Sequence, residues 1–246
     1  MATLLKLGGS VITDKDEPET VDRTSIDRAA REIGDYLDGG DDLIVVHGGG
    51  SFGHHRASVH GVTETSGSSD ATALVDIHHG MGELNEAVLA SFHEYGVQAL
   101  PVRPLSLCHR DVSGSLSMPT AHLDAMLDEG FVPVVHGDVV VHSGSGGTIL
   151  SGDEIVATAA RSLDIDRVGL CSTVPGVFDE DDTVIDEITS IDAFADALGQ
   201  SEATDVTGGM ARKVERMLDL EIPASVFGLD DLAVFLRTGT AGTVVR

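Results

Sequence analysis

The lysines of this chain are few, and all of them stand near glycine turns. Among 246 residues there are three lysines and twelve arginines, although lysine is among the commonest residues of soluble proteins. Lys6 and Lys15 flank the Gly-Gly-Ser turn of KLGGSVITDK (6–15), and Lys213 follows the Gly-Gly pair of DVTGGMARKVE (205–215). Because clustered glycines expose backbone N–H groups, a lysine beside them is suited to binding phosphate oxygens.

A third glycine-rich stretch, HGGGSFGHH (47–55), follows an apolar run and is predicted to open a helix. Its spacing matches the G-x-G-x-x-G dinucleotide fingerprint, but residues 56–69 contain no second strand, which excludes a Rossmann unit. A Walker A loop is excluded too, because His54 stands where that loop needs lysine. The stretch predicts an anion-binding turn with His54 as a donor at its end, and a glycine turn without a ligand is the alternative.

Two further residues have a simple structural explanation when each is taken alone. Asp153, in SGDEIVATAA (151–160), could be the N-cap of a helix, as could Ser151. Lys213 could be a solvated side chain, although the scarcity of lysine in this chain argues against it. Histidines outside the glycine loop, such as His78 and His122, lack the spacing of metal ligands, and no metal-binding residue is predicted.

The chain carries 41 acidic and 15 basic residues, a formal net charge of −26, and the acidic residues are spread along its length. Such a surface repels nucleic acids and anionic lipids, so both are excluded as partners. The same pattern is typical of a halophilic protein and accounts for the loss of surface lysines. Two cysteines make no disulfide framework, and no secretory or membrane-spanning segment is evident, so we expect a cytoplasmic protein.

Apolar runs alternate with amphipathic stretches along the chain. Strands are predicted at residues 3–7, 42–47, 97–102, 131–136, 167–172 and 223–228, and helices at 22–38, 70–95, 119–128, 153–163, 189–198 and 209–219. A hairpin or a kinked strand is predicted around Gly137 and Asp138, and surface loops are predicted at 66–70 and 142–148. The alternation predicts an α/β fold with a mainly parallel sheet covered on both faces, in one domain spanning residues 1–246.

Taken together, the three glycine stretches, VHGDVV (135–140) and SGDE (151–154) resemble the motifs of the amino acid kinase superfamily, in the same order, and most closely those of the isopentenyl phosphate kinases. The resemblance covers nearly the whole chain. It implies a three-layer α/β/α sandwich that forms a homodimer, with the acceptor on the N-terminal side and the nucleotide on the C-terminal side. It also implies transfer of the γ-phosphoryl group of ATP, as its Mg²⁺ complex, to isopentenyl phosphate, giving isopentenyl diphosphate for isoprenoid biosynthesis.

The resemblance assigns roles to individual residues. The ATP phosphates would be bound by Lys6, Leu7, Gly8, Gly9, Ser10, Gly50, Gly209 and Lys213, and the acceptor phosphate by Gly49, His54 and Gly152. Lys15 would lie near the transferred group, and Asp153 would orient the lysines, which makes Lys6, Lys15, His54, Asp153 and Lys213 the predicted catalytic set. The family pattern has Thr-Asp before the nucleotide-side turn, whereas this chain departs from it with Thr173 at the acidic position, where the resemblance implies a contact to the nucleotide.

Other acceptors and other classes of protein are less consistent with these residues. A kinase of the same fold acting on a phosphonate, such as a fosfomycin kinase, is the nearest alternative, and glutamate or acetylglutamate is less favoured because His54 suits a phosphate. A nucleotide-binding or oxyanion-storage protein without turnover is disfavoured, because the three lysines and Asp153 are all retained. For the five-carbon tail, Leu74 and Ile77 lie three apart on one helix face, and the alternative is that both pack in the core.

The net charge predicts that folding depends on salt. At low ionic strength the carboxylates repel one another over a Debye length of roughly 30 Å at 0.01 M. We expect loss of structure or activity after dialysis into dilute buffer and recovery at molar salt. Circular dichroism would measure the structure, and an activity assay would measure the turnover. An unchanged spectrum together with full activity in dilute buffer would contradict the halophilic interpretation.

Overall fold

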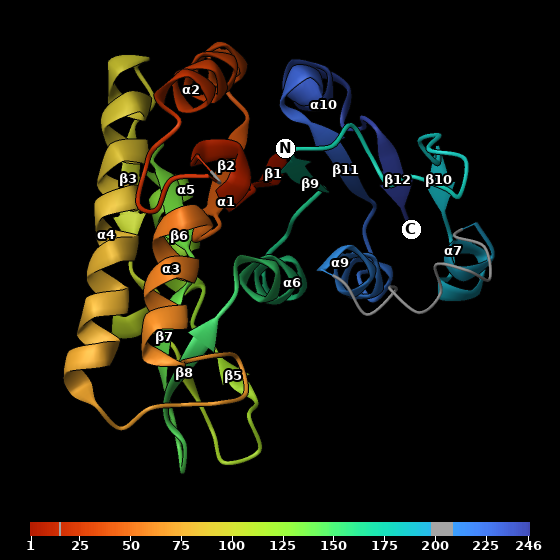
Figure 1. Cartoon of the computed structure of the whole chain (residues 1–246). Coiled ribbons are helices and arrows are strands. Elements are labelled where there is room, and N and C mark those ends of the chain that lie inside the picture. Colours follow the sequence, from red (N-terminus) through yellow and green to blue (C-terminus); the bar gives the residue numbers. More distant parts are fainter. Residues whose placement is uncertain (15, 198–208) are drawn as a thin grey trace.

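Eight strands form the central sheet of the structure, a computed structural model that describes residues 1–14, 16–197 and 209–246 (Figure 1). Every neighbouring pair in this sheet is parallel except β11 with β12. In spatial order the strands are β10 (Glu187–Ile188), β12 (Thr243–Val245), β11 (Ala224–Gly228), β9 (Arg167–Ser172), β1 (Ala2–Leu7), β2 (Asp42–His47), β6 (Val132–His136) and β3 (Ala99–Val102). The six predicted strands are confirmed, and β10 and β12 extend the sheet beyond them.

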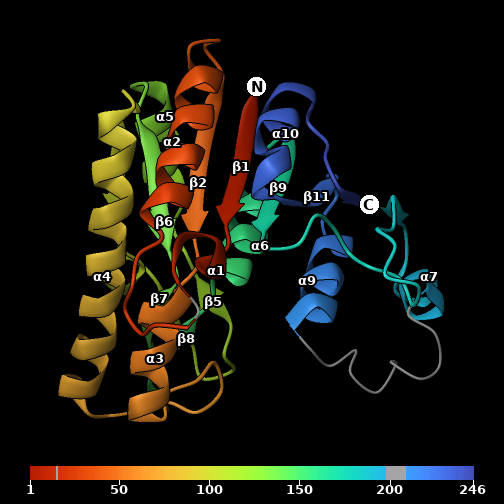
Figure 2. The ribbon, with the colours of Figure 1, turned by 45° about the horizontal axis from the view of Figure 1, so that its top comes forward.

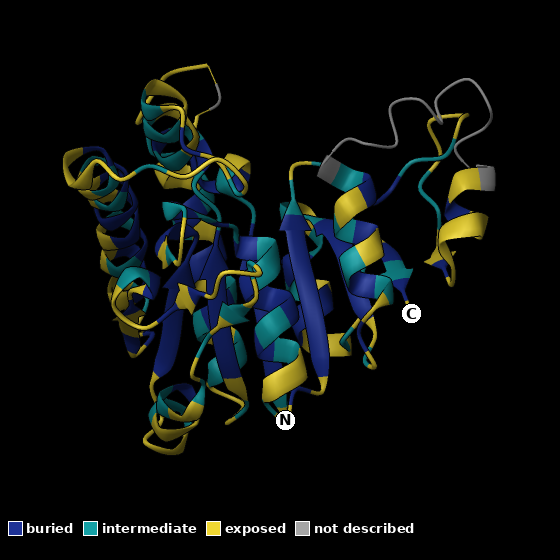
Figure 3. Ribbon diagram, turned by 90° about the horizontal axis from the view of Figure 1, so that it is seen from below, coloured by how far each residue is buried: buried dark blue, intermediate teal, exposed yellow. Residues whose placement is uncertain are grey.

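Helices cover both faces of this sheet. One face carries α2 (Arg23–Leu37), α4 (Ala71–Glu94) and α10 (Leu232–Thr238), and the other carries α5 (Ala121–Asp128), α6 (Gly152–Ser162), α7 (Ile191–Ala197) and α9 (Gly209–Leu218). Along β1, Leu5 and Leu7 belong to the core of the first face and Leu4 to that of the second. Figure 2 shows α2 and α4 side by side, and Figure 3 shows buried strands between helices with exposed outer surfaces. The predicted α/β/α sandwich is confirmed.

The predicted helices begin and end within two residues of the observed ones, and local capping explains two of the boundaries. The carboxylate of Asp22 accepts a hydrogen bond from the Ser25 N–H at the start of α2, and Asp70 accepts one from the Thr72 N–H at the start of α4. The seven-residue helix α10 was not predicted. None of the helices in the described ranges is both long and apolar enough to cross a membrane.

A second, four-stranded sheet adjoins the first, and the sequence did not predict it. It consists of β5 (Leu116–Ser117), β4 (His109–Arg110), β7 (Asp138–His142) and β8 (Gly146–Leu150), in that spatial order. The chain passes from β6 in the large sheet to β7 in the small one through Gly137, whose N–H donates to the carbonyl of His47 (3.1 Å). Of the two possibilities predicted around Gly137, the kinked strand is therefore confirmed and the hairpin is wrong.

The prediction of a surface loop at 142–148 is confirmed only for the tight turn of the β7–β8 hairpin, because His142 ends β7 and residues 146–148 begin β8. Gly144 and Gly146 both have positive φ, which is why the turn is rich in glycine. The segment 66–70 remains outside helices and strands, but Ser68 exchanges two backbone hydrogen bonds with Gly147. The small sheet is therefore tied to the chain that precedes α4.

Two short elements follow the central strands and carry the glycine motifs. Helix α1 (Gly9–Ile12) comes after β1, and α3 (Gly50–His60) comes after β2, as the glycine loop predicted. Because β1 and β2 are parallel neighbours, both turns lie at the same edge of the sheet. The N-terminus of α6, which follows β8, reaches the same edge, since a Cβ on Gly152 would lie 3.2 Å from Lys6 Cε.

Candidate functional site

A cavity of about 700 Å³ opens where the two glycine turns meet α6 and α9. Most of the predicted site residues line it, although they come from segments that are far apart in the sequence. These residues are Lys6, Gly8, Gly9, Ser10, Gly49, His54, Ile77, Gly152, Asp153, Thr173 and Lys213. The folding of β1, α3, α4, α6 and α9 thus brings the predicted acceptor and nucleotide residues into one space.

Lys6 and Asp153 form the central ion pair of this cavity. Lys6 lies on the α6 face of β1, and its Nζ donates to Asp153 Oδ1 at 2.5 Å, with both side chains less than one fifth exposed. Burial lowers the pKa of the Lys6 ammonium, and the charge and hydrogen bond of Asp153 oppose that shift. The positive charges of Lys213 and Arg216 lower the pKa of Lys6 further, so three cations share the site.

The sequence left Ser151 and Asp153 as alternative caps of α6. Ser151 is the N-cap, and its Oγ accepts a hydrogen bond from the Glu154 N–H. Asp153, in the first turn, instead holds Lys6. A carboxylate there is also stabilised by the positive end of the α6 dipole.

The two glycine turns touch each other without side chains between them. A Cβ on Gly48 would lie 2.6 Å from the Gly9 nitrogen, and a Cβ on Gly9 would clash with the backbone of Gly50. Gly50 also has a positive φ of 49°, which a β-carbon would strain. Glycine is therefore required at three positions for the backbones after β1 and β2 to approach this closely.

Several predicted site residues do not line the cavity. Leu7 is fully buried in the core, and its carbonyl accepts a hydrogen bond from the Gly48 N–H (3.0 Å). Leu74 lies against Gly147 of β8, beside the cavity, and Gly50 packs against α1. Lys15 lies outside the described residues, and Gly209 is the first residue of α9. The ligand contacts assigned to these residues stay predictions.

Apolar side chains line the part of the cavity next to His54. They come from α3, the loop that follows it, α4 and β8, and they are Ala57, Val62, Ile77, Met81 and Ile149. Ile77 and Val62 belong to a small apolar cluster beneath the small sheet. His54 itself is exposed on α3, so its ring is accessible from the cavity. The cavity thus combines a glycine- and lysine-lined region with an apolar wall.

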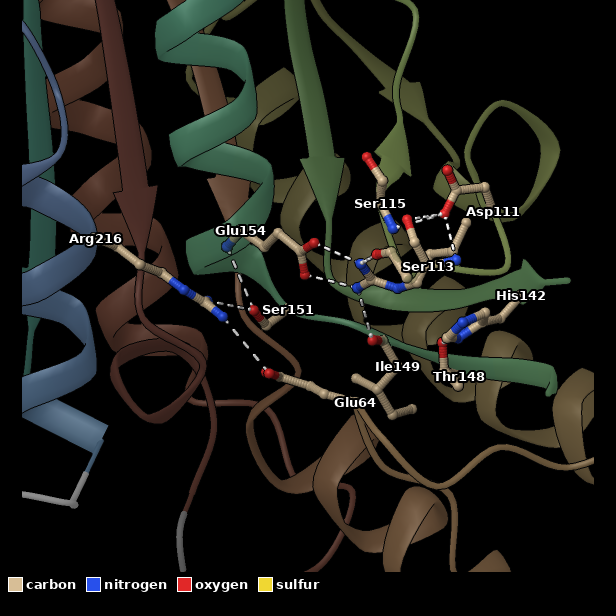
Figure 4. Close-up of polar contacts among 12 residues, drawn as sticks. Glu64, Asp111, Ser113, Ser115, His142, Thr148, Ile149, Ser151, Glu154 and Arg216 are labelled. Atoms are coloured by element: carbon tan, nitrogen blue, oxygen red, sulfur yellow. Dashed lines mark hydrogen bonds and ion pairs between the residues drawn. The ribbon is translucent and has the colours of Figure 1, made fainter. Parts of the chain in front are cut away.

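Arg216 and Glu64 are parts of this site that sequence reasoning missed. Arg216 lies one turn after Lys213 on α9, and its guanidinium donates to Ser151 Oγ at 3.0 Å and lies 3.6 Å from the Glu64 carboxylate (Figure 4). Glu64 and Ser151 both line the cavity. The three-residue spacing of Arg216 from Lys213 places both on one helix face and could have indicated Arg216. Nothing in the sequence pairs Arg216 with Glu64. Arg216 therefore connects α9 to the loop that follows α3 and to the start of α6.

Two buried polar pairs support the walls of the cavity, and neither was predicted. Arg110 of β4 binds Glu154 of α6 through two hydrogen bonds of 2.6 and 2.7 Å, which fixes the small sheet against α6. The fully buried carboxylate of Asp138, at the start of β7, lies 2.8 Å from His78 Nδ1 of α4 and accepts from the Val139 N–H. Asp138 also lines the cavity, and its place in VHGDVV was the available signal.

The sequence profile of the amino acid kinase family matches residues 1–224 of this chain. The chain belongs to the amino acid kinase family. The isopentenyl phosphate kinase of Haloferax volcanii is 56% identical over 243 residues, covering 99% of this chain and 98% of the relative. That of Methanocaldococcus jannaschii is 33% identical over 227 residues, covering 87% and 86%. A crystal structure of isopentenyl phosphate kinase superposes with a TM-score of 0.84 at 26% identity, covering 99% of this chain and all of the other.

Membership of the amino acid kinase family confirms the resemblance stated from the motifs, including the fold class. The structural match extends over the whole length, so it includes the sheet, both helix layers and the small sheet together. For a kinase of this family, the lysines and glycines around one cavity are suited to binding two phosphate-bearing molecules next to each other.

The lysines of the cavity should not tolerate arginine. Arginine keeps the charge but has a planar fork that cannot occupy the position of an ammonium group, and Lys6 is packed against Asp153 and Gly152. We expect K6R and K213R, like the corresponding Lys→Met variants and K15R, to lose roughly 10²–10³ in kcat while folding is retained. Steady-state kinetics and thermal melting would measure this. Arg161→Lys, on the exposed far end of α6, is the control, and wild-type turnover in all the Lys→Arg variants would contradict the prediction.

Proposed function

We propose that this protein transfers the γ-phosphoryl group of ATP to isopentenyl phosphate and so forms isopentenyl diphosphate. The observation that carries the proposal is the cavity that joins the Lys6–Asp153 pair and the glycine turns to an apolar wall. A phosphorylated five-carbon alcohol has the matching chemistry, with an anionic end and an apolar end. The relatives that cover nearly the whole chain are isopentenyl phosphate kinases, which supports the same acceptor.

The reaction needs positioning and positive charge more than it needs a base. An oxygen of the acceptor phosphate attacks the γ-phosphorus, the bond from that phosphorus to the β,γ-bridging oxygen breaks, and ADP leaves. The attacking oxygen is already ionised near neutral pH, so no side chain has to remove a proton. Lys6 and Lys213 would compensate the charge on the transferred group, and Asp153 would fix the Lys6 ammonium between the two substrates.

The two substrates are assigned to opposite sides of Lys6. We place the acceptor phosphate at the amides of Gly49 and Gly152 and at His54, and the ATP phosphates at Gly8, Gly9 and Ser10, with Gly50, Gly209 and Lys213. The N-terminus of α6 supports the acceptor side, because the positive end of the helix dipole favours an anion beside Gly152. Thr173 lines the cavity beyond Gly8, on the side we assign to ATP. Mg²⁺ enters with the ATP phosphates as part of the substrate.

The apolar wall supports an isoprenoid tail over the other acceptors. Ile77 and Met81 are almost fully buried, yet both contribute to the cavity lining next to His54. Removing a five-carbon tail from water there is favourable by about 0.8 kcal/mol per CH₂. A phosphonate with a small polar body or an amino-acid carboxylate would not use this surface, so those alternatives are not favoured. A homodimer and a cytoplasmic location stay predictions.

The experiment that tests the proposal is an acceptor panel. Purified protein, in molar salt with Mg²⁺ and ATP, is incubated with isopentenyl phosphate, short alkyl phosphates, fosfomycin and acetylglutamate, and ADP formation is followed. We expect isopentenyl phosphate to have the highest kcat/KM, and product analysis to show a diphosphate. Preference for fosfomycin or for acetylglutamate would replace the proposed acceptor, and no turnover with any of them would contradict the proposal.

His54 should act on the acceptor rather than on ATP. If its ring donates to the acceptor phosphate, His54→Ala loses a charge-assisted hydrogen bond of about 1.5–3 kcal/mol. We expect a raised KM for isopentenyl phosphate and a KM for ATP that is nearly unchanged. His55→Ala is the matched control, because His55 is the next residue of α3, is also exposed and is not part of the cavity lining. Equal changes for both substrates, or none, would contradict the assignment.

A further inference from the structure

His47, the last residue of β2, is completely buried beneath the glycine loop. Its ring makes two polar contacts. Nδ1 lies 3.1 Å from the carbonyl oxygen of Gly48, and Nε2 lies 3.0 Å from the side-chain amide nitrogen of Asn85, which is buried on α4. The ring therefore connects the middle of α4 to the peptide that begins the glycine loop.

These contacts determine which ring nitrogen carries the proton. A carbonyl oxygen only accepts hydrogen bonds, so Nδ1, which faces Gly48, must be the protonated nitrogen. Burial, together with the neighbouring His136, lowers the pKa of His47 to about 3, so the ring is neutral and Nε2 is bare. Asn85 then donates its amide N–H to Nε2. The donor and the acceptor of the imidazole are both used.

The bond to Gly48 also sets the direction of the next amide. The peptide between Gly48 and Gly49 is trans, so its C=O and N–H point in opposite directions. With the carbonyl oxygen turned toward His47, the Gly49 N–H points away from the buried ring, and both glycines line the cavity. We infer that His47 is a positioning residue that aims the Gly49 amide at the acceptor phosphate, an inference that rests on the proposed function.

A peptide between two glycines needs such a restraint. Without β-carbons, Gly48 and Gly49 can rotate their common peptide at little cost, and the reversed orientation would present a carbonyl oxygen to the cavity. An oxygen facing the acceptor phosphate would repel it, whereas an N–H binds it. The hydrogen bond from His47 opposes that rotation. It also polarises the peptide in the sense that strengthens the Gly49 N–H as a donor.

The test compares two substitutions of His47. Asn has an amide nitrogen at the position of Nδ1, so His47→Asn can keep the bond to Gly48, whereas His47→Leu cannot. We expect H47L to raise the KM for isopentenyl phosphate about tenfold, the lower end of the loss that follows removal of a metal ligand's hydrogen-bond partner, with the KM for ATP within about twofold. We expect H47N to recover most of this loss. His93→Leu is the control, because its ring Nε2 lies 2.8 Å from a backbone carbonyl, that of Ala99, and it does not line the cavity.

A spectroscopic measurement on the wild-type protein covers the case in which H47L does not fold. Long-range ¹H–¹⁵N spectra distinguish the two neutral tautomers of histidine, and we expect His47 to carry its proton on Nδ1 throughout the pH range of activity. The inference would be overturned by a proton on Nε2 or by equal KM values for H47L and H47N. It would also be overturned by a KM for ATP that rises as much as the KM for the acceptor. If wild-type protein does not phosphorylate isopentenyl phosphate, the proposed function fails instead, which the acceptor panel shows separately.

Discussion

The buried ammonium group of Lys6 constrains the structure around it. A charge that is nine-tenths removed from solvent needs a counter-charge within hydrogen-bond distance, and Asp153 supplies it from another layer of the sandwich. This requires the N-terminus of α6 to meet the end of β1, which the chain achieves with Ser151 as the cap and Gly152 as the residue that clears Lys6. The ion pair of Arg110 with Glu154 then holds the same helix against the small sheet.

The cavity brings cations together in a protein that is strongly acidic. The protein has a formal net charge of −26, yet Lys213 and Arg216 lie close enough to Lys6 to lower the pKa of its ammonium group. Two anionic substrates approaching such a molecule are repelled at long range, and the cations of the cavity offset this repulsion only at short range. Salt would weaken the long-range repulsion while leaving the partly buried pairs less affected. A high-salt environment is therefore compatible with binding as well as with folding.

The elements that could be predicted from the sequence are those with a local cause. Buried strands such as 42–47 are continuous apolar runs, and α2 and α4 begin at capping aspartates, so their positions were predicted within a residue or two. The small sheet was missed because β4 and β5 have only two residues each and have no detectable periodicity. Residues 142–148 predict a single loop, whereas positive φ at Gly144 and Gly146 allows a short hairpin turn after which β8 begins.

The part of the site that could be predicted from the sequence also has a local cause. Glycine turns and rare lysines are visible in one stretch of sequence, and most of these residues line the cavity. The partners of Arg216 could not be predicted, because Glu64 and Ser151 are joined to it only by the folded chain. His47 was visible next to the glycines, but its role depends on Asn85 on a different element. A residue that acts through another residue can be identified only from the folded structure.

The passage of one continuous chain from β6 to β7 has a consequence for how the cavity can vary. Gly137 is the single residue between the two strands, and its N–H is bound to the carbonyl of His47 at the end of β2. The small sheet, which supplies Ile149 to the apolar wall, is therefore joined to β6 through Gly137 and to the strand that precedes the glycine loop by this hydrogen bond. A shift of the small sheet along β2 would have to break this hydrogen bond. Among homologues with this connection, acceptors of different length should be accommodated by changes in side-chain volume, with the backbone held in register.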